Sequence, residues 1–410
     1  MRNFGVILIL VLYSLTANCQ WGKVKYIDKP LTCISATPKG EIIFIGTGEA
    51  EVGRSADGGN SFTFQKLESQ GYVEDFLFEN ETTGYACGGC IIDDSNCSAN
   101  TIFKTTNGGL TWQSIHKTAG IGKIIKLQKT KNGKLFGLGE FDGVFVSKDE
   151  KNFQKIEIDP KLTKGSFVNF QMFDDGTGYI SHLFKTKKKI YKTLDHGESW
   201  FNIFESELLD FTAEFHFADP NLGFLKLAKG SYFKTEDGGL KWSQVQVASE
   251  FHTINQTEFI SSWKGYFVSR HGGTLRGNLF RTDDGGLSWN QELGMATTFW
   301  TDIYPIDEER ALGIVDDNII LKRFSPTELK GNTIKIFPNP FVENLKIRMQ
   351  YYDPSLVFEI YDSFSRLVAK ERLIDFENVL DGSFFHSGYY YIRIIKNETE
   401  TIHSQGFIKR

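Results

Sequence analysis

Four carboxylates near the starts of predicted inner strands are the side chains best suited to chemistry. They are Glu74, Asp75, Glu214 and Asp302. Two carboxyl groups about 5–9.5 Å apart, one of them protonated, are what glycoside hydrolysis requires. Because sequence spacing does not give that separation, the pattern supports a glycan hydrolase only as an alternative hypothesis.

A second set of polar side chains belongs to loops expected on the same face. It comprises His182, Arg270, His271 and Arg276. These charges either contact a ligand or only solvate the rim. The chain lacks a Gly-x-Ser-x-Gly nucleophile elbow, a phosphate-binding loop and a metal-binding His cluster, and it lacks the Arg-Ile-Pro motif of sialidases. We therefore expect no metal and no cofactor, and we favour a binding role over catalysis.

Cysteine usage points to disulfides. Cys87 and Cys90 have the CxxC spacing of redox and zinc sites, but neither a βαβ context nor a second ligand pair accompanies them. In an exported chain the favoured interpretation is a disulfide that closes the loop between Cys90 and Cys97. Cys33 and Cys87 are then either paired or free.

The N-terminus predicts export. Arg2 precedes an apolar run over residues 4–15, which is too short to span a bilayer, since spanning takes about 20 residues. It suits the hydrophobic region of a signal peptide covering residues 1–19, cleaved before Gln20. The rival interpretation makes Cys19 a lipid attachment site. No other segment is predicted to cross a membrane.

A short turn sequence recurs along most of the chain and must position these candidate groups. Its copies are Ser55–Phe62, Thr105–Trp112, Thr193–Trp200, Thr235–Trp242 and Thr282–Trp289, with a degenerate copy at Ser147–Phe153. Their central residues are Asp57, Asn107, Asp149, Asp195, Asp237 and Asp284, in steps of 42–50 residues. Such a period fits one four-stranded propeller blade, which takes about 40–50 residues.

The repeated turn has a structural logic. An Asp or Asn side chain can accept backbone N–H groups two residues on, and paired glycines permit the positive φ that a tight hairpin needs. The closing aromatic residue can be buried between sheets; four of these are Trp112, Trp200, Trp242 and Trp289. One Asp per blade cannot converge on one substrate, so we interpret these residues as structural.

Blade counting gives seven. Six turns mark six blades, and residues 300–307, 310–315 and 318–324 supply three further strands. The stretch Trp21–Ile27 precedes the first blade and can provide the missing fourth strand. That pairing closes the ring and removes exposed sheet edges. We therefore predict an all-β chain with a seven-bladed β-propeller over residues 20–324.

The pattern changes after residue 324. A linker at residues 325–332 leads to alternating short strands over residues 333–410, which predict a small β-sandwich. The formal net charge is only -5, with both signs interspersed. This balance does not favour nucleic acid as a partner. The expected state is a monomer.

The repeated turns resemble those of Asp-box (BNR) propellers, and most of all the Ycf48-like propellers. The resemblance covers residues 20–324 and implies the fold. It does not imply one activity, because sialidases, xyloglucan-type hydrolases and sortilin ectodomains share such turns. The photosystem role of Ycf48-like proteins is not carried over.

The C-terminal part resembles the type A sorting domain of the type IX secretion system. The residues that carry this likeness are Pro338-Asn339-Pro340, Tyr361-Asp362, Ser387-Gly388-Tyr389-Tyr390 and the basic end Lys409-Arg410. Ser365 departs from the pattern, since the family usually has Gly there. The resemblance implies a Bacteroidota host, passage through the periplasm, the secretion machinery as a partner, and removal of the domain. The mature propeller would be secreted or held at the cell surface, where it binds a glycan or protein.

Overall fold

The structure is a computed structural model of the 410-residue chain. It describes residues 20–68, 71–90, 99–118, 122–160, 164–185, 187–207, 215–226, 232–245, 253–261, 263–270, 277–286, 288–295, 299–324, 334–349, 351–353, 355–373, 376–396 and 400–410. The predicted signal peptide at residues 1–19 and the linker at residues 325–332 lie outside these ranges.

The described chain is built from β-strands, with one 3₁₀ turn. Its first part forms four-stranded antiparallel units in chain order, each with a central-facing first strand. They are β2 (Leu31–Ala36), β3 (Ile43–Thr47), β4 (Glu51–Ser55), β5 (Thr63–Lys66); β6 (Tyr72–Phe78), β7 (Gly84–Cys90), β8 (Ala99–Thr105), β9 (Gln113–Thr118); β10 (Gly122–Lys129), β11 (Leu135–Gly139), β12 (Gly143–Ser147), β13 (Gln154–Ile156); and β14 (Ser166–Met172), β15 (Gly178–Phe184), β16 (Lys187–Thr193), β17 (Phe201–Ser206).

The remaining units continue the same order. They are β18 (Phe215–Phe217), β19 (Gly223–Lys226), β20 (Tyr232–Thr235), β21 (Ser243–Val245); β22 (Thr253–Phe259), β23 (Gly265–Arg270), β24 (Gly277–Thr282), β25 (Asn290–Met295); and β26 (Trp300–Pro305), β27 (Ala311–Val315), β28 (Ile319–Phe324), with β1 (Gln20–Tyr26) beside β28. Two units are joined, because β10 also pairs with β7 through Gly122 and Lys123.

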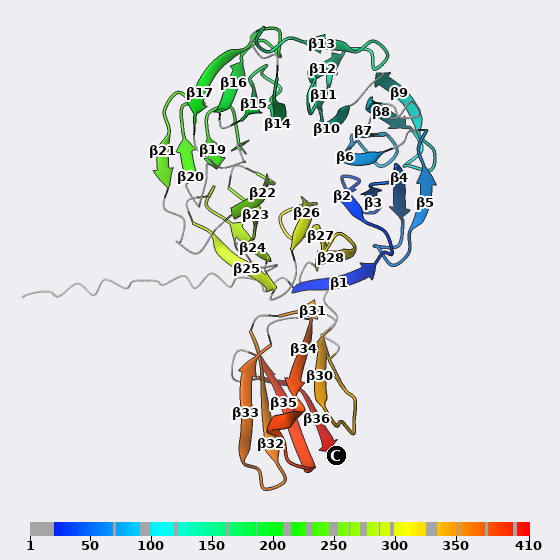
Figure 1. Cartoon of the computed structure of the whole chain (residues 1–410), viewed down its shortest axis with the longest axis vertical. Coiled ribbons are helices and arrows are strands. Elements are labelled where there is room, and N and C mark those ends of the chain that lie inside the picture. Colours follow the sequence, from blue (N-terminus) through cyan, green and yellow to red (C-terminus); the bar gives the residue numbers. More distant parts are fainter. Residues whose placement is uncertain are drawn as a thin grey trace, which may run out of the picture.

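The units are arranged as a ring around a central opening (Figure 1). Strands β2, β6, β10, β14, β22 and β26 lie next to the opening, and β5, β9, β13, β17, β21 and β25 lie on the outside. Inner strands of successive units contact one another, and β26 contacts β2, so the ring closes. An arrangement of this kind leaves few free sheet edges.

Closure depends on the N-terminal strand, as the sequence predicted. β1 pairs antiparallel with β28, from Gln20 opposite Phe324 to Tyr26 opposite Ile319. Trp21 is 1% exposed, and its ring meets Trp300 edge-on at 5.6 Å. Its Nε1 donates to Glu292 Oε1 on β25 at 3.2 Å. The first described strand therefore ties the last unit to the one before it.

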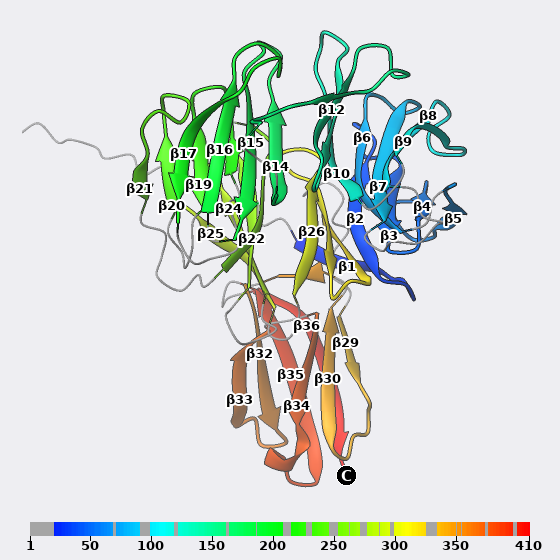
Figure 2. The same ribbon diagram turned by 45° about the horizontal axis from the view of Figure 1, so that its top comes forward.

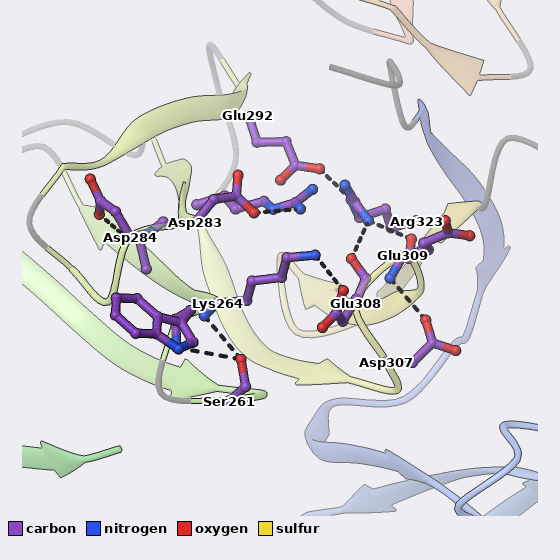
Figure 3. A network of polar contacts seen from close by, with 12 residues as sticks. Ser261, Lys264, Asp283, Asp284, Glu292, Asp307, Glu308, Glu309 and Arg323 are labelled. Atoms are coloured by element: carbon purple, nitrogen blue, oxygen red, sulfur yellow. Dashed lines mark hydrogen bonds and ion pairs between the residues drawn. The ribbon is translucent and has the colours of Figure 1, made fainter. Parts of the chain in front are cut away.

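A polar network reinforces this junction (Figure 3). The buried Arg323 guanidinium on β28 pairs with Glu292 and donates to the carbonyl oxygens of Glu308 and Glu309. Lys264 forms a further ion pair with Glu308. A buried ion such as Arg323 needs partners in close contact, since removing one partner leaves an uncompensated charge that costs about 3–5 kcal/mol.

The turn tryptophans fill the space between neighbouring sheets. Trp112 packs edge-on against Phe44 of the preceding unit, with ring centroids 6.2 Å apart, and also against Phe78 of its own unit. Trp242 packs in the same way against Phe204 and Phe217. In these two copies the closing aromatic residue is partly buried between two sheets.

The C-terminal part forms two facing sheets below the ring (Figure 2). Its elements are β29 (Ile334–Phe337), β30 (Asn344–Met349), β31 (Tyr351–Tyr352), β32 (Leu356–Asp362), β33 (Leu367–Arg372), β34 (Glu377–Asp381), η1 (Gly382–Phe384), β35 (Gly388–Lys396) and β36 (Glu400–Lys409). One sheet has the order β29-β30-β34 and the other β33-β32-β35-β36.

The two parts of the chain are in direct contact. β31 pairs with β1 through Tyr352 opposite Trp21 and Tyr351 opposite Gly22. One continuous apolar cluster also contains Trp21 and Trp300 of the ring together with Ile336 and Leu345 of the C-terminal part. The closing strand β1 is therefore held on both sides, by β28 and by β31.

Candidate functional site

A cavity of about 290 Å³ lies on the axis of the ring. Every inner strand contributes to its lining, which consists of Thr32, Cys33, Glu74, Asp75, Ile125, Lys126, Val168, Asn169, Gln171, Phe215, His216, Gln256, Thr257, Glu258, Thr301 and Asp302. Most of these side chains are polar. The hollow is therefore suited to a ligand with hydrogen-bonding groups.

β-Bulges in the inner strands aim these side chains at the axis. The register with the second strand slips by one residue between Val73 and Asp75, and between Trp300 and Asp302. The same slip occurs at the equivalent place in β2, β10, β14 and β22. A bulge sets two residues against one and re-aims the strand locally. As a result, the bulged residue and the one after it can both line the cavity.

The residue after the bulge links its strand to the next. Asp75 Oδ2 accepts the backbone N–H of Leu127 on β10 at 2.8 Å, and Asp302 Oδ2 accepts that of Ile34 on β2 at 2.8 Å. Their Oδ1 atoms accept N–H groups of their own strands, from Phe76 and Ile303. Both carboxyl groups therefore hold adjacent units together.

Burial makes these two acids unusual. It raises the pKa of Asp75 to about 7 and the pKa of Asp302 to about 7, because a carboxylate loses hydration inside the ring. The backbone N–H groups that they accept act in the opposite direction. A carboxyl group with a pKa near 7 can serve as a general acid, so the contacts that Asp75 and Asp302 make distinguish a catalytic from a structural role.

The other lining groups do not form an acid–base device with a nucleophile. His216 stacks on Phe259 at 4.6 Å, and burial lowers its pKa to about 3, so it is neutral at physiological pH. Glu74 is paired with Lys123 at 2.9 Å. Lys126 Nζ donates to Asn169 Oδ1 at 3.2 Å. The lining thus holds four carboxyl groups and one lysine, and of the four, Asp75 and Asp302 have a pKa near 7 and Glu74 is ion-paired.

The structure brings three predicted residues to the axis, namely Glu74, Asp75 and Asp302. His182 is buried in β15, where its ring meets Phe167 edge-on at 5.0 Å, and it does not line the cavity. Glu214, His271 and Arg276 lie outside the described residues. Arg270 ends β23, and its side chain is likewise not described.

Sequence reasoning missed several lining residues, among them Lys126, Asn169, His216, Gln256 and Glu258. One signal could have found some of them. A polar residue precedes an aromatic or aliphatic one in the middle of an apolar first strand, as in Asn169-Phe170 and Asp302-Ile303. That pattern marks the position after the bulge in β6, β10, β14 and β26.

The repeated turns lie between the third and fourth strands of their units, on the periphery. In the first copy Ser55 Oγ accepts the N–H of Gly59 at 2.9 Å, and Asp57 Oδ1 accepts the N–H of Ser61 at 2.9 Å. The acceptor therefore reaches four residues along the chain, rather than the two that we predicted. The longer reach follows from Gly58 and Gly59, both at positive φ, which widen the turn.

The same contacts recur around Asn107, Asp195, Asp237 and Asp284. The degenerate copy differs, because Asp149 accepts from Lys151 and Asn152, two and three residues on. Hydrogen bonds from Ser61 lower the pKa of Asp57 to about 2. None of these turn residues lines the central cavity.

The cysteines divide into two kinds. Cys90 is disulfide-bonded, while Cys33 and Cys87 are free and buried. Cys97, the expected partner of Cys90, lies outside the described residues. Burial raises the pKa of both free thiols, which keeps them protonated and unreactive. Among the described residues, no group of His, Cys, Asp and Glu could hold a metal ion.

Comparison with known families identifies the C-terminal part. Residues 335–409 match the family described as secretion system C-terminal sorting domain. No curated protein sequence matches the chain. No helix in the described part of the chain is long and apolar enough to cross a membrane.

Solved structures resemble the ring. YCF48 from Cyanidioschyzon merolae superimposes with a TM-score of 0.59 at 14% identity, covering 76% of this chain and all (100%) of that one. The GH74 xyloglucanase from Xanthomonas campestris gives a TM-score of 0.58 at 13% identity, covering 92% of this chain and 65% of that one. U3-55K gives 0.53 at 9% identity, covering 74% and 98%. Identities this low establish the fold alone.

The chain is thus an all-β protein with a propeller and a type IX secretion C-terminal sorting domain. The sorting domain directs it toward secretion or the outer surface and implies contact with the type IX machinery.

Proposed function

We propose that this chain is an exported binding protein. A signal peptide at residues 1–19 takes it to the periplasm, and the sorting domain takes it across the outer membrane. There a seven-bladed Asp-box propeller over residues 20–324 binds a protein ligand through its central cavity. The host would be a member of the Bacteroidota.

One observation carries the binding role. Polar side chains from all the inner strands converge on one cavity of about 290 Å³. Asp75 and Asp302, the two lining carboxyl groups with a pKa near 7, accept hydrogen bonds that hold neighbouring strands together. The lining carboxylate Glu258 favours a ligand that inserts a basic side chain. A YCF48 structure with 14% identity and a TM-score of 0.56 is described as bound to D1 peptide, which makes a polypeptide a reasonable ligand class.

The test uses the chain without its predicted signal peptide, residues 20–410, against a random peptide display library and a panel of polysaccharides. We expect enriched peptides that contain Lys or Arg and bind less tightly at high salt. Glu258→Gln, in the cavity, should weaken binding at least tenfold. Glu205→Gln, a solvent-exposed glutamate on β17, should not. Peptides that bind both variants equally, or capture of glycans alone, would contradict the proposal.

A glycoside hydrolase is the second candidate. The near-neutral pKa values of Asp75 and Asp302 favour it, and so does the likeness to a xyloglucanase fold. Released sugars from xyloglucan or another polysaccharide, lost in Asp75→Asn or Asp302→Asn, would establish it. We expect no product, because both carboxyl groups already accept two or more hydrogen bonds from the scaffold.

A further inference from the structure

The sheet β33-β32-β35-β36 of the sorting domain has two contrasting faces. Its inner face carries Ile360, Ile392 and Phe407, which are fully buried in the core. Side chains alternate between faces along a strand, so the intervening residues point outward. The outward residues of this sheet include several large apolar side chains and a charged group formed by Glu359, Lys370 and Arg393.

Five outward residues form what we call the aromatic row: Leu367, Tyr361, Tyr391, Tyr389 and Ile408. The strand register aligns them across the sheet, with Leu367 opposite Tyr361 and Tyr361 opposite Tyr391. Tyr389 lies opposite Ile408 on the last strand. Leu367, Tyr389, Tyr391 and Ile408 are 53%, 55%, 39% and 43% exposed. The row therefore presents apolar area from all four strands.

Gly406 makes room for this arrangement. It lies opposite Tyr391 in the register, and a Cβ there would fall 2.1 Å from the hydroxyl oxygen of Tyr389. Any other residue would push that ring off the strand. The glycine thus allows the tyrosine to lie across β36.

An ion cluster lies beside the row on the same outward face, where Glu359 is opposite both Lys370 and Arg393 in the strand register. Glu359 is buried at 7% exposure and accepts from Tyr361 Oη at 2.6 Å and from Arg393 at 2.6 Å, with Lys370 Nζ 3.0 Å away. The Arg393 guanidinium also lies over the Tyr361 ring. Charge-assisted contacts of this kind hold side chains in place, so the surface is formed before a partner arrives.

The other surfaces of the domain are less suited to a partner. The free edge of β36 is covered, because Asn339 donates to Gly406 O at 3.1 Å and accepts from Ile408 N at 3.0 Å, while Phe341 bridges to Lys409. The outer face of β29-β30-β34 is charged and self-paired, with Glu377 bonded to Lys346 and Arg348. Other exposed apolar residues of the domain, such as Phe364 and Phe384, lie in turns, whereas the aromatic row is an apolar line that crosses four strands.

We propose that the aromatic row is the surface by which a protein of the type IX secretion machinery recognises this sorting domain. The inference rests on the proposed export function and names its contact surface. Protein interfaces are enriched in Tyr and Arg at their centres, and exposed apolar patches of a few hundred Å² mark interaction sites. The part of the partner that meets the row would be apolar, since the charges beside the row are already paired with one another.

The test measures export of the full chain in a cell with a type IX system, as the ratio of protein in the medium or on the surface to protein retained in the periplasm. Tyr391→Ser and Tyr389→Ser remove parts of the row. Val379→Ser and Phe384→Ser are matched controls, because these residues are 57% and 80% exposed in the same domain but lie off the row. Deletion of residues 334–410 tests the function of the domain itself.

We expect the row variants to lower the export ratio at least tenfold while the controls export normally, with unchanged thermal unfolding of all purified variants. Normal export of both row variants, or equal loss in the controls, would overturn the proposal. Export without residues 334–410 would instead refute the export function. A purified chain that forms dimers lost in Tyr391→Ser, with normal export, would assign the row to self-association and also overturn it.

Discussion

Closure of the ring by β1 leads to a quantitative prediction for Trp21→Ala. The indole is 1% exposed, meets Trp300 at 5.6 Å and donates to Glu292 at 3.2 Å. Replacing a buried Trp by Ala costs about 3–5 kcal/mol. The strand should therefore detach from β28 more often, and those amides of residues 319–324 that bond to β1 should exchange about 10²- to 4 × 10³-fold faster, at about 1.4 kcal/mol per tenfold.

Hydrogen exchange followed by mass spectrometry on residues 20–410 measures this effect segment by segment. Tyr26→Ala is the matched control, since Tyr26 belongs to the same strand but is 52% exposed. Its effect should stay within about 0.5 kcal/mol. Equal exchange at residues 319–324 in the two variants would refute the idea that Trp21 holds the ring closed.

Two further predictions concern single positions. Ser365 adopts φ +62° in the turn between β32 and β33, a backbone conformation that favours Gly. Ser365→Gly should therefore stabilise the sorting domain by about 0.5–1 kcal/mol, whereas Ser363→Gly in the same turn should not. A thermal scan in which Ser363→Gly is the more stable variant would contradict this prediction. Asp302 binds its proton more tightly in the folded state, with a pKa of about 7, than in the unfolded chain. Its contribution to stability is therefore complete below the unfolded pKa of about 4 and is lost as the pH rises through 7. Between pH 5 and pH 8 the free energy of unfolding should fall by about 2 kcal/mol. Urea midpoints at the two pH values should therefore shift less in Asp302→Asn than in the natural chain; an equal shift would count against the raised pKa.

Local turn chemistry was readable from the sequence, because each repeated turn is specified by adjacent residues. The Ser or Thr, the Asp or Asn and the paired glycines make their contacts within a few positions of one another. Pairing of β1 with β28 was also predictable, since an unpaired strand and a three-stranded unit were left at opposite ends of the repeat.

The axis was harder to predict, because it is assembled from strands far apart in sequence. Asp302 bonds to Ile34, 268 residues away, and nothing local indicates that partner. The bulges were not foreseen either, although they decide which side chains face inward. His182 was expected on the ligand face, but its place in the strand alternation buries it against Phe167.

Repetition itself separates scaffold from site in this molecule. At the peripheral turns, copy after copy uses the same residue types, as expected where one hydrogen-bond pattern is required each time. The position after the bulge plays an equivalent geometric part in six inner strands, yet it holds Cys33, Asp75, Lys126, Asn169, Gln256 or Asp302. If this position served only to hold the next strand, one acceptor would suffice throughout. The variety of charge and size at one ring of equivalent sites is what a cavity shaped for an asymmetric ligand requires, and it is the reason to search for that ligand at the axis rather than at the turns.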